Sequence, residues 1–295
     1  MELRHIRYFV RAAEFLHFTR AAESLCVSQP ALSLHIKQLE EEVGSPLFDR
    51  TGGHVRHVRL TEAGKRLLVH AREILREIER GKQEIADLRG LLCGHVTLGA
   101  NNIFVPKLVS KCVPEYSAAY PNVDVIVKMV NQEGLESTIL AGTIDLALAW
   151  LPPESKEIVA EPLFSDELVV VVSNKHPLAH LEEISLCELN NLPVALPTIA
   201  SNMRRLVNAE FARQSVALRI SLEIDDTLAR LKFVEAGSAA TLAPRRAVDD
   251  RATLRTIPIA DVQLSLSAGL LTQRGVHLSS AAQALADVIR AGFRD

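Results

Sequence analysis

Residues Phe18–Leu39 read FTRAAESLCVSQPALSLHIKQL, and this stretch decides the fold of the first part of the chain. Thr19 can cap a short helix, and Ser28 can cap a second one whose first turn tolerates a proline. Two short helices joined by a tight turn, with alanines at their crossing, are typical of a helix-turn-helix. The polar residues that the second helix would offer to a DNA major groove are Gln29, Ser33 and Lys37.

The same pattern also fits two packed helices with polar outer faces, and the glutamates at 40–42 would repel a phosphate backbone. The next segment favours DNA binding, because two short strands around Gly52 and Gly53 predict a β-hairpin. Three residues would make this hairpin a basic wing beside the second helix: Arg50, His54 and Arg56. The helix pair and the wing together predict a DNA-binding unit.

The composition is that of an ordinary globular protein, with 295 residues, 48% of them hydrophobic and 23% charged. It excludes a disordered tail, a collagen and a disulfide scaffold, and the length predicts two or three domains. Because the protein has a net charge of −3, it could bind a nucleic acid only through a local positively charged surface. No apolar run is long enough to span a bilayer and no secretory signal opens the chain, so we expect a cytoplasmic protein without a membrane partner.

From Thr61 to Leu92 the sequence predicts one long helix with an unbroken apolar seam. The seam residues recur in steps of four and three: Leu67, Ala71, Ile74, Ile78, Gly81, Ile85, Leu88 and Leu92. Such spacing favours a coiled coil with a second copy of the helix. The alternative is an amphipathic helix that packs on its own domain, and Gly81 weakens the seam locally.

After Cys93 and Gly94 the pattern changes to short β-rich runs that alternate with helices. The clearest runs are residues 95–100, 123–129, 145–150 and 168–173, which predict a parallel sheet covered on both faces. Ligands of such sheets bind beyond the carboxyl ends of the strands, near helix N-termini. The candidate effector-binding residues at these ends are Ala100, Asn101, Asn102, Ile103, Asn131, Trp150, Thr198, Ser201, Asn202 and Thr227.

Amides beside free N–H groups, as at Asn101 and Asn102, would suit a carboxylate or another small anion. An ordinary asparagine cap is the structural alternative for this loop, and core packing is the alternative for Trp150.

Three motifs give the chain a family resemblance. The array A-A-x-x-L-x-V-S-Q-P-A-L-S-x-x-I-x-x-L-E runs from Ala21 to Glu40, G-x-x-L-F-x-R from Gly44 to Arg50, and L-T-x-A-G from Leu60 to Gly64. In these positions the chain resembles the LysR-type transcriptional regulators. Ala141–Leu148 is similar to a signature in the effector domain of that family. The resemblance covers the whole chain, strongest before residue 65 and only architectural after about residue 150.

The resemblance implies an α + α/β architecture with three parts. These would be a winged helix-turn-helix over 1–60, a linker and dimerisation helix over 61–92, and a periplasmic-binding-protein-like effector domain over 93–295. Subdomain I would comprise 93–166 and 268–295 and subdomain II 167–267, with two crossings that permit a hinge motion. The resemblance also implies homodimers that pair into a homotetramer and bind double-stranded promoter DNA, with RNA polymerase as a further partner. The candidate residues of the cleft are mostly neutral and polar, which is compatible with a small organic or aromatic acid as effector but equally with other small molecules.

Motif and resemblance together give the DNA-binding residues as Thr19, Arg20, Ser28, Gln29, Pro30, Ser33, Lys37, Arg50, His54 and Arg56. Leu34 departs from the family pattern, because several relatives carry a base-reading Arg or Gln at this position. We therefore expect fewer direct base contacts here, with DNA shape and wing contacts contributing more.

Other function classes have less support. The sequence contains no G-x-S-x-G, Walker loop, GxGxxG or H-E-x-x-H, so we expect no enzyme, metal or cofactor. A redox sensor that uses Cys112 or Cys187 is an alternative, although lone cysteines in apolar surroundings are more often small buried hydrophobes. A solute-binding protein without DNA function is disfavoured by the helix-turn-helix.

Overall fold

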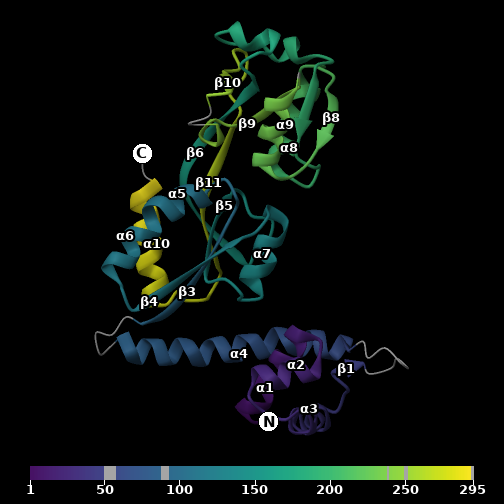
Figure 1. Cartoon of the computed structure of the whole chain (residues 1–295), viewed down its shortest axis with the longest axis vertical. Helices are drawn as coiled ribbons and strands as arrows, with labels where there is room; N and C mark the ends of the chain where they lie inside the picture. Colours follow the sequence, from purple (N-terminus) through teal and green to yellow (C-terminus); the bar gives the residue numbers. More distant parts are fainter. Residues whose placement is uncertain (50–57, 88–92, 238, 249–251, 294–295) are drawn as a thin grey trace. The chain divides into compact units, whose positions relative to one another are not determined.

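The computed structural model of the protein describes residues 1–49, 58–87, 93–237, 239–248 and 252–293 (Figure 1). The chain forms two compact units, Met1–Gly90 and Leu91–Asp295. Within the described ranges, every helix is too short or too polar to cross a membrane.

The first unit contains the predicted helix pair. Its helices and strands are α1 (Leu3–Phe15), α2 (Phe18–Ser24), α3 (Gln29–Val43), β1 (Phe48–Asp49), β2 (Arg59–Leu60) and α4 (Glu62–Asp87). The Ser28 side chain caps α3 as predicted, accepting a hydrogen bond from the N–H of Ala31 at 3.3 Å. The predicted cap of α2 was wrong: Thr19 already lies in the first turn, and His17 caps the helix by accepting from the N–H of Arg20.

The two strands of the predicted hairpin pair antiparallel, with Phe48 opposite Leu60. The Phe48 ring packs at 5.6 Å from Phe9 of α1 and 5.2 Å from Phe18 of α2, between ring centroids. The hairpin base is thereby fixed to the helix pair. The residues between the strands, including the predicted wing residues Arg50, His54 and Arg56, lie outside the described residues.

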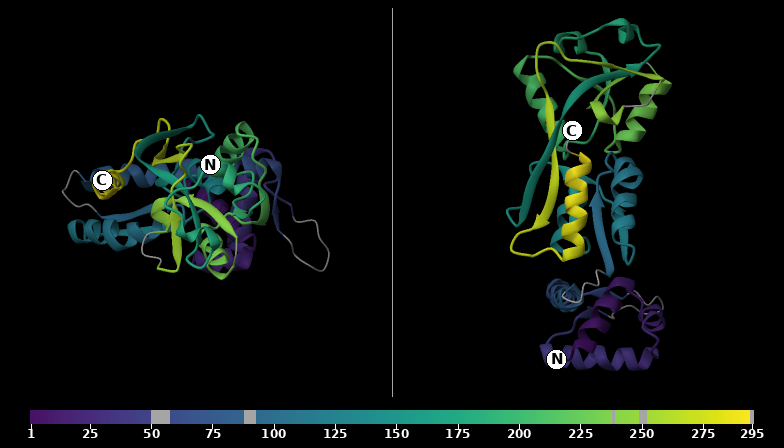
Figure 2. Two further views of the ribbon diagram at one scale, coloured as in Figure 1. Left: turned by 90° about the horizontal axis from the view of Figure 1, so that it is seen from above. Right: turned by 90° about the vertical axis from the view of Figure 1, so that its left-hand side faces the viewer.

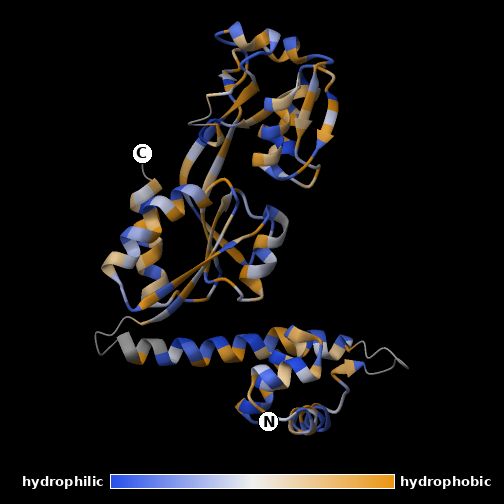
Figure 3. Ribbon diagram, in the orientation of Figure 1, coloured by the Kyte–Doolittle hydropathy of each residue, from blue (hydrophilic) through white to orange (hydrophobic). Residues whose placement is uncertain are grey.

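The apolar seam of α4 divides into two parts. Thr61 caps the helix, since its hydroxyl accepts from the N–H of Gly64 at 3.0 Å. Leu67 and Ala71 pack on the core of the first unit. For the N-terminal half of the seam, the alternative prediction of a helix that packs on its own domain is therefore correct. Further along, Ile74 and Ile85 are 39% and 57% exposed, and Figure 3 shows such hydrophobic positions recurring on a mostly hydrophilic helix. Seam positions 88 and 92 lie outside the described residues.

The second unit is built on a mixed sheet, with nine strands among its described residues. Its strands are β3 (Gly94–Ala100), β4 (Val123–Met129), β5 (Leu146–Trp150), β6 (Ile158–Ser173), β7 (Pro193–Leu196), β8 (Arg219–Glu223), β9 (Ala240–Pro244), β10 (Leu254–Ile257) and β11 (Ser265–Gln273). They are ordered β4-β3-β5-β11-β6-β9-β7-β8, and β10 pairs with β6.

Helices cover both faces of each half of this sheet. They are α5 (Val105–Lys107), a π-helical turn (Leu108–Cys112), α6 (Val113–Ala119), α7 (Gln132–Leu140), α8 (Asn202–Arg213), α9 (Thr227–Ala236) and α10 (Ser280–Phe293). Short 3-10 turns span Pro177–His180, Leu186–Leu189 and Arg245–Ala247. In the half that holds β3 to β5, α10 packs in one core cluster and α7 in another. In the other half, α8 and α9 likewise belong to separate clusters.

The prediction of parallel pairing is correct for part of the sheet. Strands β3, β4 and β5 are parallel, and so are β7, β8 and β9. It was wrong for β6, β10 and β11, which pair antiparallel. The reason is that β6 leaves one half of the unit and β11 returns to it, so the two strands run in opposite directions side by side (Figure 2).

The partners of β6 change along its length. Residues 158–167 pair with β11, residues 168–171 with β9 and residues 170–173 with β10. Below, the half with β3, β4 and β5 is called the first half of the unit and the half with β7, β8 and β9 the second half. The residue limits of the two subdomains stay a prediction.

Candidate functional site

The predicted residues on α2 and α3 lie on the surface of the first unit. Thr19, Arg20, Ser28, Gln29, Pro30 and Lys37 are exposed, and Ser33 is half-buried. The Gln29 amide donates to the Ser33 hydroxyl at 2.8 Å, and the Lys37 ammonium lies 3.5 Å from the Glu41 carboxylate. The Arg20 guanidinium lies over the Phe15 ring, 5.7 Å from its centroid. The first two turns of α3 therefore present polar side chains that solvent or a partner can reach.

The three glutamates at the end of α3 differ in their contacts. Glu40 points back to the hairpin, where its carboxylate accepts from the N–H groups of Leu47 and Phe48 at 2.8 and 3.1 Å. Glu42 bonds to the amino group of Met1, and this contact lowers the pKa of the carboxyl. Glu40 thus holds the start of β1, which weakens the objection that the glutamates would repel DNA.

A second candidate site is a cavity of about 280 Å³ inside the second unit. Strand ends and helix starts from both halves of that unit form its wall. The lining residues are Asn101, Asn102, Ile103, Met129, Val130, Asn131, Gln132, Trp150, Pro197, Ser201, Met203, Asp225, Asp226, Thr227, Arg230 and Pro244.

Seven predicted effector-binding residues line this cavity: Asn101, Asn102, Ile103, Asn131, Trp150, Ser201 and Thr227. The other three lie beside it. Ala100 is fully buried at the end of β3. Thr198 donates from its N–H and its hydroxyl to the Asp225 carboxylate, both at 2.9 Å, and the Asn202 amide donates to the carbonyl of Pro152 at 3.2 Å.

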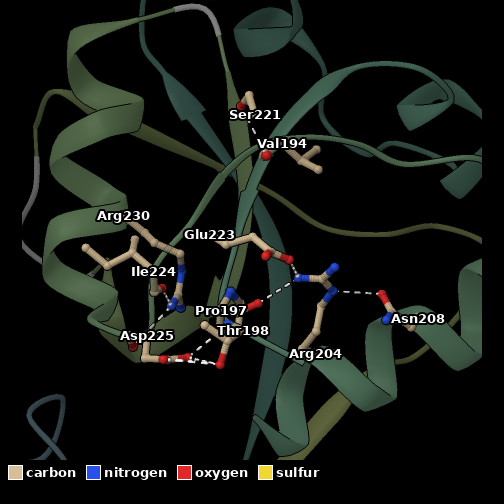
Figure 4. A network of polar contacts seen from close by, with 10 residues as sticks. All are labelled: Val194, Pro197, Thr198, Arg204, Asn208, Ser221, Glu223, Ile224, Asp225 and Arg230. Atoms are coloured by element: carbon tan, nitrogen blue, oxygen red, sulfur yellow. Dashed lines mark hydrogen bonds and ion pairs between the residues drawn. The ribbon is translucent and has the colours of Figure 1, made fainter. Parts of the chain in front are cut away.

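The sequence did not point to a charged cluster at the start of α9. Arg230 is 2% exposed, and its guanidinium donates to the carbonyls of Ile224 and Asp225 at 2.9 and 3.3 Å (Figure 4). It also donates to the Thr227 hydroxyl at 3.2 Å. Burial lowers the pKa of Arg230 to about 10, against the opposing effect of Asp225 and Asp226. The side chain therefore keeps its positive charge at neutral pH. Only its position one turn after Thr227, a predicted effector-binding residue, could have indicated Arg230.

A second buried arginine holds the loop between β7 and α8. Figure 4 shows Arg204 between Pro197, Glu223 and Asn208. Its guanidinium donates to the Pro197 carbonyl and to the Glu223 carboxylate, both at 2.7 Å. Because this loop carries Pro197 and Ser201, Arg204 fixes one wall of the cavity without lining it.

Three helix N-termini reach the cavity. Asn131 caps α7 by accepting from the N–H of Gly134, and Asp226 caps α9 by accepting from the N–H of Ala229. Ser201 is the N-cap residue of α8, but its hydroxyl makes no capping hydrogen bond. Helix N-termini carry partial positive charge and favour anions, whereas the two aspartates oppose them.

Besides the hydrogen bond from Asn202 to Pro152, two polar contacts join the first and second halves of the unit across the cavity region. The Asn102 amide donates to the Asp226 carboxylate at 2.7 Å, between residues 124 positions apart. The Arg205 guanidinium lies 2.8 Å from the Glu154 carboxylate. In the described ranges, no cluster of His, Cys, Asp and Glu side chains is arranged to hold a metal ion.

Both units of the chain match models of known protein families. Residues 3–65 match the family model described as bacterial regulatory helix-turn-helix protein, lysR family, and residues 89–294 match the LysR substrate binding domain. The chain is 30% identical to the transcriptional dual regulator GltC of Bacillus subtilis (strain 168) over 286 residues, which cover 96% of this chain and 94% of GltC.

Two further similarities agree with these matches. The Hca operon transcriptional activator HcaR of Escherichia coli (strain K12) is 35% identical over 252 residues, which cover 83% of this chain and 82% of HcaR. The fold is similar to that of a full-length OxyR variant from Pseudomonas aeruginosa, with a TM-score of 0.79, 24% identity, and coverage of 98% of this chain and 95% of OxyR.

Proposed function

The chain belongs to the LysR family, as a DNA-binding transcriptional regulator with an effector-binding domain, and we propose which of its residues carry these two activities. Promoter DNA binds to the first unit through the N-terminal turns of α3. This proposal is carried by one observation: Ser28, Gln29, Pro30 and Lys37 are exposed on the second helix of a helix-turn-helix whose other face is buried. Thr19, Arg20 and Ser33 complete the contact surface, with Arg50, His54 and Arg56 contributed by the wing.

A second copy of the chain binds along α4, so that the regulator is a homodimer. The support is that Ile74 and Ile85, two members of the predicted seam, are exposed although an apolar seam is most stable when covered. Two dimers then form the homotetramer. We propose that residues 1–60 form the DNA-binding domain, residues 61–92 the dimerisation helix and residues 93–295 the effector-binding domain. We also propose that the DNA-bound regulator contacts RNA polymerase.

A small organic or aromatic acid binds in the cavity of the second unit. Three helix starts and the buried guanidinium of Arg230 favour an anionic group there, and the uncapped start of α8 at Ser201 is where we place it. Trp150 packs against Phe104 with ring centroids 4.8 Å apart and offers an aromatic surface to the rest of the effector. Asp225 and Asp226 would repel a second anionic group, which favours a monoacid.

The effector regulates DNA binding by changing the equilibrium between arrangements of the two halves of the second unit. A ligand shifts such an equilibrium only by its difference in affinity for the two arrangements. The coupling expected is about 1–3 kcal/mol, enough to change the occupancy or bend of the promoter.

The relatives of this chain are transcriptional regulators, and we propose that it has no enzymatic activity. Because a promoter-binding regulator must reach the chromosome, we place it in the cytoplasm.

The alternative that the protein is a redox sensor has less support. Cys112 is buried in the core, and burial raises the pKa of its thiol, which lowers the reactive thiolate fraction. Regulation that is unchanged under peroxide in Cys187→Ser would remove this alternative.

Footprinting tests the proposed function directly. The purified full chain is incubated with DNA upstream of its own gene and of the divergent neighbour, over a series of salt concentrations. We expect two nearby protected sites that weaken steeply with salt, because phosphate contacts release counterions. No protection at low salt, with oligomers intact in solution, would contradict DNA binding by the unliganded protein.

Fluorescence tests the effector site separately, since Trp150 is the only tryptophan. Benzoate and succinate serve as an aromatic monoacid and an aliphatic diacid. We expect benzoate to change the emission at lower concentration than succinate. The reverse order would contradict the preference for a monoacid, and no response to either would contradict acid binding beside Trp150.

A further inference from the structure

The exposed face of α3, all of whose residues the structure describes, carries a leucine. Leu34 is 56% exposed, whereas Leu32 and Ile36 on the buried face are fully covered. Val43 in the last turn is the other large apolar residue that α3 exposes. Leu34 occupies the sixth position of a 15-residue helix, in the half from which a recognition helix contacts base edges.

The polar neighbours of Leu34 on the helix surface are engaged with one another. Gln29 and Ser33 are hydrogen-bonded to each other, Lys37 pairs with Glu41, and the amide oxygen of Gln38, one turn after Leu34, lies 3.2 Å from the Nδ1 of His35. Pro30, four residues earlier, is exposed and lies on the same face. Pro30 and Leu34 therefore form a short apolar strip inside a polar surface, which an apolar group of a partner would cover.

The major groove of DNA offers one apolar group, the 5-methyl group of thymine. A leucine has neither a donor nor an acceptor, so it cannot read a base edge by hydrogen bonds. We infer that Leu34 contacts a thymine methyl group in the major groove and so specifies an A·T pair at one position of each half-site. This inference rests on the DNA binding by α3 proposed above. The expectation of fewer base contacts at this position is thereby replaced by one apolar base contact, made by Leu34.

The test begins with selection of binding sites. The full chain and its Leu34→Ala variant are each used to select duplexes from a pool with a randomised segment of about three helical turns, long enough for two half-sites. The enriched sequences are then compared. We expect the wild-type site to contain a fixed A·T pair that Leu34→Ala no longer requires. Leu34 is exposed and alanine is a strong helix former, so the variant should fold normally, which circular dichroism checks.

Uracil substitution then removes only the methyl group. Each thymine of the selected site is replaced in turn by deoxyuridine, and affinity is measured at one fixed salt concentration. For the wild type we expect one position per half-site at which affinity falls about fourfold, the effect of burying one methyl group. Leu34→Ala should bind the thymine and uracil sites equally. Val43→Ala, which removes the other exposed apolar residue of α3, should keep the wild-type sensitivity.

The outcomes separate this inference from the proposed function. An enriched site at which no uracil lowers wild-type affinity would overturn the thymine contact and leave DNA binding intact. Equal uracil sensitivity in the wild type and in Leu34→Ala would assign the methyl contact to another residue, and would also overturn it. A pool from which nothing is enriched would overturn DNA binding by α3, and this inference with it.

Discussion

The exposed face of α3 and the wall of the cavity both carry polar side chains, but in opposite surroundings. On α3, Gln29 is exposed and hydrogen-bonds to a neighbouring side chain on the same helix. In the cavity wall, Arg230 is buried and bonds to backbone carbonyls of the strand-end loop. A polar residue on the exposed face of α3 can change without unfolding the protein, whereas one in the cavity wall holds the fold and the site together.

The largest expected effect is therefore on stability, at Arg230. Arg230→Leu leaves the carbonyls of Ile224 and Asp225 without their buried donor and should lower the free energy of unfolding by about 2–4 kcal/mol. Urea denaturation measures it. Lys232→Leu, an exposed position on the same helix, is the control and should cost less than about 0.5 kcal/mol. Equal losses of unfolding free energy in Arg230→Leu and Lys232→Leu would show that a buried polar residue of the cavity wall is no more important for stability than an exposed one.

The next effect concerns DNA affinity, at Gln29. If Gln29 contacts a base, Gln29→Ala should weaken specific binding by about tenfold, from the loss of a contact worth about 1–3 kcal/mol. Its unfolding free energy should change little, because the side chain is exposed. Gel-shift titration and urea denaturation are the two measurements, with Gln283→Ala on α10 as the matched control. A stability loss as large as the affinity loss would mean that Gln29 acts on the fold.

Ser28 tests whether exposure alone makes a residue dispensable for stability, because its side chain is exposed and yet caps α3. Its hydroxyl caps α3 by accepting from Ala31, so Ser28→Ala should cost about 1 kcal/mol of unfolding free energy. Ser33→Ala, inside the same helix, should cost less, since alanine has the higher helix propensity. Thermal unfolding followed by circular dichroism compares the two. Equal destabilisation would show that the cap contributes nothing of its own.

The smallest expected effect is at Asn102, whose amide joins the two halves of the second unit through Asp226. Asn102→Ala should remove about 0.5–1.5 kcal/mol from this contact and speed amide exchange near the start of α9 by up to about tenfold. Hydrogen exchange with mass spectrometry measures it. Asn174→Ala, which loses one weaker bond to the carbonyl of Ala252, should leave α9 unchanged. Unchanged exchange in Asn102→Ala would show that the contact does not hold the two halves together.

The site predictions differ in how far they depend on folding. Ser28 was found from its place before a helix, and its capping bond reaches three residues along the chain. His17 was missed as the cap of α2, because a histidine side chain is a rare N-cap and Thr19 is a common type. Asn131 and Ser201 were predicted from the rule that ligands bind where strands end, and both line the cavity, although their separation in space could not be read from the sequence.

The sequence by itself determined the helix-turn-helix, the cap of α3, the long helix and the alternation of strands and helices after residue 93. All of these follow from capping and from side-chain spacings of two to four residues along the chain, where the backbone geometry is fixed. The tertiary structure decided which half of the α4 seam is covered, the reversal at β6 and β11, and the meeting of Asn102 with Asp226. These depend on packing between distant segments. The burial that makes Arg230 structural and leaves Leu34 exposed depends on such packing too.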